Sequence, residues 1–155
     1  MRYIHNAALV LLAVLFAVMV VVGTMQVVNR SLFNSSLSWS EELQKFTFIW
    51  AVFIAIPVAY TRNAHLRVDV LLDLMPPRLA GVMGTLTDVL WLVLGLAFVF
   101  LTWKLMSVAR YQQSAGLGIS MAWAYSGMLI GGAYLALCAT VKLVARRHVA
   151  VEVTT

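Results

Sequence analysis

The chain has 155 residues, of which 63% are hydrophobic and only 11% are charged, with a formal net charge of +5. Soluble domains usually carry about 25% charged residues, and a water-soluble core of this size could not bury so much apolar surface. Because the charges lie between long apolar runs, the sequence predicts an all-α integral membrane protein with a single membrane domain over residues 1–155.

Four apolar runs predict four transmembrane helices, at about residues 7–28, 43–60, 79–103 and 120–143. At about 1.5 Å per residue the first run reaches roughly 33 Å, enough for a hydrocarbon core near 30 Å. It is longer than the apolar region of a cleaved signal peptide, so we expect it to remain in the membrane.

The border before the second span carries two acids and a tryptophan. Ser38 and Glu41 have the S-x-x-E spacing of a capping box, which satisfies the first backbone amides of a helix. Glu41 and Glu42 also favour the positive end of the helix dipole, and Trp39 suits the headgroup layer. We therefore expect these four residues to cap the second span and anchor it at the outer interface.

The segment between the second and third spans has an amphipathic pattern over residues 64–75. Its apolar residues recur at i, i+3, i+4 and i+7, which predicts a short helix lying in the membrane interface. His65 and Asp69 would be neighbours on it, as an interfacial structural pair or as a pH sensor. The polar residues of this cytoplasmic interfacial segment are Arg62, His65, Arg67, Asp69 and Asp73.

Two features lie inside the later spans. Asp88 is an intramembrane acid, a candidate for coupling an ion or a proton. A structural interpretation has it in the inner third of the span, where it caps, reaches the interface or pairs with a cytoplasmic arginine. Gly127 and Gly131 form a G-x-x-x-G spacing in the fourth span, which favours close helix packing.

The distribution of basic residues predicts the orientation. Four spans place both termini on one side, and that side carries more of the lysines and arginines than the other. The positive-inside rule then puts both termini in the cytoplasm. The basic residues therefore set topology and do not indicate nucleic acid as a partner.

Signatures of enzymes and cofactors are missing from the sequence. His5, His65 and His148 lie at or outside the span ends, whereas a buried haem needs ligands within the helices. The single cysteine excludes an internal disulfide or a cysteine zinc cluster. We expect no enzymatic activity and no cofactor. Two alternatives are the membrane anchor subunit of a redox enzyme and a small self-sufficient carrier that uses Asp88.

Residues 30–76 resemble the small membrane subunit of tripartite ATP-independent periplasmic (TRAP) transporters, the DctQ-like family. The resemblance rests on an ordered set of motifs. They are Arg30, Phe33-Asn34, Trp39, Glu41-Glu42-Leu43, an aromatic-rich span, and "RNAHLRVDVLLDLMP" at 62–76.

This resemblance implies a function and a set of partners. Such small subunits pair with a large DctM-like permease subunit in the bacterial or archaeal cytoplasmic membrane, and a periplasmic DctP-like binding protein delivers the substrate. The family imports organic acids, such as C4-dicarboxylates and sialic acid, driven by a sodium gradient. The small subunit would act as a scaffold, and Arg30 and Asn34 would belong to a periplasmic docking surface.

Overall fold

The computed structural model describes residues 2–33, 37–61 and 76–152. Within these residues the chain forms four helices, α1 (Arg2–Phe33), α2 (Ser38–Thr61), α4 (Pro77–Ala109) and α5 (Met121–Glu152). Each is long and apolar enough to cross a membrane, which confirms the expected all-helical protein with four membrane-spanning helices. The predicted interfacial segment at 64–75 lies outside the described residues.

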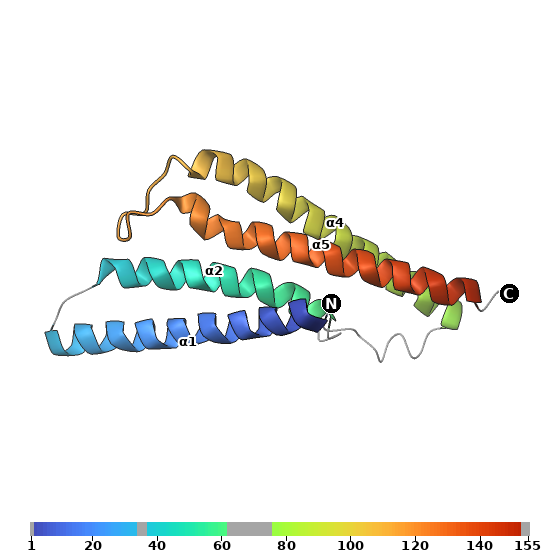
Figure 1. The fold of residues 1–155 in the computed structure, drawn as a ribbon, viewed down its shortest axis with the longest axis horizontal. Helices are drawn as coiled ribbons and strands as arrows, with labels where there is room; N and C mark the ends of the chain where they lie inside the picture. Colours follow the sequence, from blue (N-terminus) through green and yellow to red (C-terminus); the bar gives the residue numbers. More distant parts are fainter. Residues whose placement is uncertain (1, 34–36, 62–75, 153–155) are drawn as a thin grey trace.

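The helices form a layer in the order α1, α2, α5, α4 (Figure 1). α5 packs between α2 and α4, and α1 packs against α2. The first turn of α1 and the last turn of α5 lie at one end of the layer, which we call the terminal end. The connection at residues 110–120 lies at the opposite end, which we call the loop end (Figure 1).

Glycines set the close spacing between α2 and α5. A Cβ atom on Gly127 would lie 2.7 Å from the Trp50 ring, and one on Gly131 would run into the backbone of Phe53. Small residues let helix backbones approach closely where lipid offers no hydrophobic driving force. The predicted packing glycines therefore face α2.

A second pair of glycines brings α5 close to α4. A Cβ on Gly95 would lie 2.8 Å from the backbone nitrogen of Ala136, and one on Gly132 would lie 2.8 Å from Cβ of Phe98. Because α5 presents glycines in both directions, the side chains of α2 and α4 meet across it. Phe53 and Phe98 do so edge to face, with ring centroids 5.1 Å apart.

Two small groups of buried side chains form the core. One consists of Tyr60, Leu135, Cys138 and Ala139, between α2 and α5. The other consists of Ala8, Ile54 and Val58, where α1 meets α2. The core is thus concentrated along α2 and α5.

The outer helices leave most of their apolar surface uncovered. Only 6% of the most apolar part of α1 and 11% of that of α4 are buried, compared with 28% for α2 and 33% for α5. In a single layer of helices, each outer helix has a neighbour on one side only, so most of its apolar surface stays uncovered. Lipid or another membrane protein must cover these faces.

Candidate functional site

The loop end is built around Glu42, in the second turn of α2. One oxygen of its carboxylate, Oε2, accepts hydrogen bonds from the Ser114 hydroxyl, from the backbone N–H of Gly116 at 2.8 Å and from that of Leu117 at 3.1 Å. An ionised carboxylate only accepts hydrogen bonds, so it suits three donors converging on one point. This contact ties the loop between α4 and α5 to the start of α2, 72 residues earlier in the chain.

The 110–120 loop is folded by its own hydrogen bonds. The backbone N–H of Ser114 donates to Ile119 O at 2.9 Å, and that of Gly118 donates to Ser114 O at 2.9 Å. Gly118 has φ of 65°, a left-handed conformation that glycine adopts without a steric penalty. The turn therefore presents the amides of Gly116 and Leu117 in the same direction, toward Glu42.

Gly116 is needed where the loop meets α2. A Cβ atom at this position would lie 3.0 Å from both the Glu42 carboxylate and Cα of Trp39. The absence of a side chain lets the loop backbone rest directly on the first turn of α2. Glu42 and Trp39 are predicted from the sequence alone, whereas Ser114, Gly116 and Leu117 are not. The one local signal was the G-x-G spacing at 116–118.

Glu41 connects α2 to α1 rather than to the loop. Its Oε1 accepts a hydrogen bond of 3.3 Å from Nε2 of Gln26. Ser38 is the first residue of α2 and is exposed, and Ser40 is buried with its hydroxyl bonded to Leu37 O at 2.7 Å. The capping box of Ser38 and Glu41 stays a prediction.

Two tryptophans pack together near the loop end. Trp50 and Trp123 stack with centroids 5.5 Å apart, and Nε1 of Trp50 donates to the backbone oxygen of Trp123 at 3.3 Å. This contact fastens α2 to the first turn of α5 close to the loop.

Asp88 forms a second polar cluster, nearer the terminal end. Its side chain is buried, and Oδ1 accepts a hydrogen bond of 2.8 Å from the Tyr60 hydroxyl on α2. Nζ of Lys142, on α5, lies 3.9 Å from the same oxygen and 4.5 Å from the centroid of the Tyr60 ring. Three helices thus contribute one side chain each to this cluster.

The expectation that Asp88 caps, reaches the interface or pairs with a cytoplasmic arginine stays a prediction. The described contacts add a lysine and a tyrosine, which the sequence did not indicate. From the sequence alone, Lys142 is one of the basic residues near the span ends that set the topology. The sequence does show an acid and a base inside two apolar runs. Charged side chains within membrane spans tend to pair with one another.

The remaining predicted residues are dispersed. Arg30 lies exposed in the last turn of α1. Asn34, Arg62, His65, Arg67, Asp69 and Asp73 lie outside the described residues. Within the described ranges, no three histidine, cysteine or acidic side chains come together in a way that could hold a metal ion.

Curated relatives are TRAP transporter permeases. The chain is 32% identical over 92 residues to a Haemophilus influenzae protein assigned as a TRAP transporter small permease, a match that covers 59% of this chain and 57% of that protein. It is 29% identical over 128 residues to the sialic acid TRAP transporter permease protein SiaT of the same species, covering 83% of this chain and 21% of SiaT. It is 24% identical over 134 residues to the sialic acid TRAP transporter small permease protein SiaQ of Vibrio cholerae, covering 86% and 78%.

The chain thus spans a little over half of the first of these proteins and about a fifth of the second. The family model that matches it describes the DctQ component of tripartite ATP-independent periplasmic transporters, and the match runs over residues 19–149. This range includes the Glu42 contact, the Asp88 cluster and both pairs of packing glycines. The chain is a multi-pass membrane protein that belongs to the DctQ family of TRAP transporter components, a family of transporters and not of enzymes.

Proposed function

We propose that this chain is the small permease subunit of a TRAP transporter and works as a membrane scaffold for a large, DctM-like permease. The observation that carries this proposal is the uncovered apolar surface of α1 and α4. A protein that worked alone would need a polar route for its solute. In the described part of this chain, Asp88 is the buried carboxylate, and its side chain is held between Tyr60 and Lys142.

The names of the relatives support a substrate class and a partner in the same membrane. SiaT and SiaQ are named for sialic acid, a carboxylate. In SiaT the matching region is a fifth of a longer permease, which supports a lateral partner for the present chain. We infer that the complex imports an organic acid, driven by a sodium gradient, across the bacterial or archaeal cytoplasmic membrane.

The orientation follows from the basic residues. With both termini in the cytoplasm, the loop end faces the periplasm. Arg30 at the end of α1, and Trp39 and Glu41 at the start of α2, would then share the outer surface with the Glu42-bound loop. We propose that this surface, together with Asn34, contributes to docking of a periplasmic substrate-binding protein.

The scaffold role is tested by reconstitution. The large permease is placed in proteoliposomes with and without this chain, and sodium-driven uptake is measured in the presence of the binding protein. We expect uptake only with both membrane proteins and none from this chain alone. Full uptake by the large permease without this chain would refute the scaffold role, and uptake by this chain alone would favour a carrier that uses Asp88.

The docking surface is tested separately with Arg30→Glu. Transport by the intact complex is measured while the concentration of binding protein is varied. We expect a higher concentration for half-maximal uptake and an unchanged maximal rate. Lys104→Glu, a charge reversal at an exposed site on α4, is the matched control. Identical concentration curves for the two variants would argue against docking at Arg30.

A further inference from the structure

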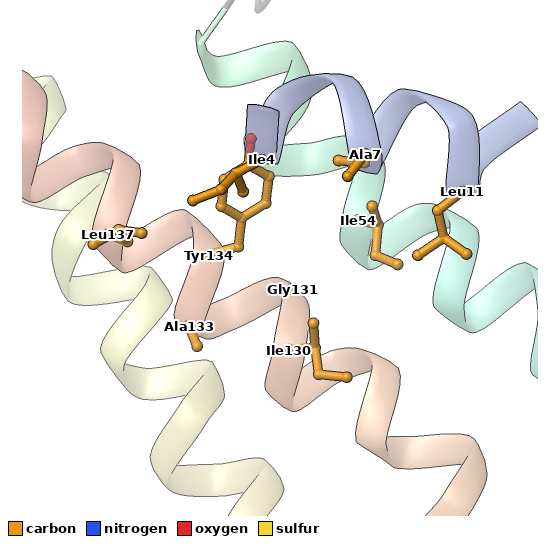
Figure 2. A pocket seen from close by; sticks show the side chains of 10 residues that line it. Ile4, Ala7, Leu11, Ile54, Ile130, Gly131, Ala133, Tyr134 and Leu137 are labelled. Atoms are coloured by element: carbon orange, nitrogen blue, oxygen red, sulfur yellow. The ribbon is translucent and has the colours of Figure 1, made fainter. Parts of the chain in front are cut away.

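An open groove runs between α1 and α5, with α2 at its base (Figure 2). Ala7 and Leu11 belong to the α1 wall, and Ala133 and Tyr134 belong to the α5 wall. Ile54 of α2 is buried beneath them. Apart from the phenol of Tyr134, the side chains that line the groove are aliphatic or absent. The groove therefore suits an apolar occupant and offers few hydrogen bonds.

The size of the groove indicates a slender occupant. Its volume is about 520 Å³. Its α1 wall runs from Ile4 to Leu11, a rise of about 10 Å for an α-helix. A single hydrocarbon chain is thin enough to lie along the groove. A helix, about 10 Å across with its side chains, could insert only one face into it.

The charge beyond the groove indicates what the occupant carries at its end. Arg2 begins α1, two residues before Ile4. Along α5, Arg146 and Arg147 follow Leu137, the last residue of that wall, over about 15 Å of helix. Helix α5 has one acid in these last turns, Glu152. Arg2, Arg146 and Arg147 are thus basic residues in the helix turns just beyond the groove, where a headgroup would lie.

We propose that this groove binds one acyl chain of an anionic phospholipid, with the phosphate at the basic terminal end. The apolar lining, the narrow volume and the charge each point to this occupant. Basic residues next to a membrane attract anionic lipids. The proposal requires only that the chain lies in a bilayer, so it stands or falls separately from the scaffold role.

The test uses native mass spectrometry of the full chain released from nanodiscs. The nanodiscs contain equal amounts of phosphatidylglycerol and phosphatidylcholine with identical acyl chains. We expect the adduct with one phosphatidylglycerol to exceed the phosphatidylcholine adduct about fivefold, the effect of one basic side chain on an anionic headgroup. Equal amounts of the two adducts would overturn the proposal.

Variants that fill the groove locate the binding. Ala7 and Ala133 line opposite walls and are exposed, so Ala7→Phe and Ala133→Phe should narrow the groove without disturbing the core. Each should abolish the preference for phosphatidylglycerol. Ala13→Phe is the matched control, because Ala13 is exposed on the opposite side of α1.

Two results would contradict the placement in the groove. The first is a preference for phosphatidylglycerol that survives both groove variants. The second is loss of the lipid, with crosslinks from Ala133→Cys to the large permease, when the two membrane subunits are combined. That result would mean that the groove binds the large permease and not a lipid.

Discussion

Two carboxylates fasten α2 to the α4–α5 hairpin, one near each end of the layer, and they do so in different ways. Glu42 accepts hydrogen bonds from neutral donors of a single loop, at a partly exposed site. Asp88 is buried among helices, where a tyrosine hydroxyl and the ammonium group of Lys142 approach it. The loop end therefore resembles a folded surface loop, whereas the Asp88 cluster depends on pairing a charge inside apolar surroundings.

This difference predicts that the two connections fail differently. Removal of one partner from a buried ion pair leaves the other charge buried without its counter-ion, which lowers the stability of the whole fold. Loss of a hydrogen bond to a surface loop releases the loop while the helices stay in place.

Lys142→Met should destabilise the protein by about 3 kcal/mol, the lower end of the range for breaking a buried pair. The lower end applies because the Lys142 side chain is 27% exposed, compared with 2% for Asp88. The measurement is the free energy of unfolding in mixed micelles with increasing denaturing detergent. The paired variant Asp88→Asn/Lys142→Met should recover most of the loss, since the amide oxygen can still accept the Tyr60 hydrogen bond.

The double variant is also the decisive control. If it is as unstable as Lys142→Met alone, the charge of Asp88 is not what makes the lysine necessary. The cluster would then act through packing, for example through the contact of Lys142 with the Tyr60 ring. The contrast between the two ends of the layer would lose its electrostatic basis.

Gly131→Ala should have the next largest effect, about 2 kcal/mol of destabilisation, because overpacking a tight seam costs about 1–3 kcal/mol. The added methyl group would meet the backbone of Phe53, which cannot move aside as a flexible side chain could. Unfolding in mixed micelles measures it. Gly81→Ala on α4 is the matched control, because no atom lies within 4 Å of its Cβ position. Similar stabilities for the two alanine variants would mean that the contact of Gly131 with Phe53 does not set the spacing of α2 and α5.

The sequence predicted these elements unequally, for physical reasons. Four apolar runs were enough for the helices, because length and hydropathy alone decide whether a segment can span a membrane. Gly127 and Gly131 were found by their spacing along one helix. Gly95 was not, because its role depends on where α4 crosses Ala136.

The polar contacts were harder to predict, since they join distant parts of the chain. Glu42 was recognised as an acid at the start of a helix, which is a local property. Its partners in the 114–117 loop depend on how α4 and α5 return the chain to α2. Asp88 likewise was recognised as an unusual intramembrane acid, while Tyr60 and Lys142 come from two other helices.

Glu42→Gln is expected to have the smallest and most local effect. The amide of glutamine keeps an acceptor oxygen but loses the negative charge that strengthens the three hydrogen bonds. We expect severalfold faster hydrogen exchange at the Gly116 and Leu117 amides, with unchanged exchange in the middle of α2 and α5. Glu41→Gln provides the control, because Glu41 bonds to Gln26 of α1 and not to the loop. Faster loop exchange in both variants alike would mean that general loss of charge loosens this end. Faster exchange throughout α5 in Glu42→Gln would mean that the loop end, like the Asp88 cluster, holds the helices together.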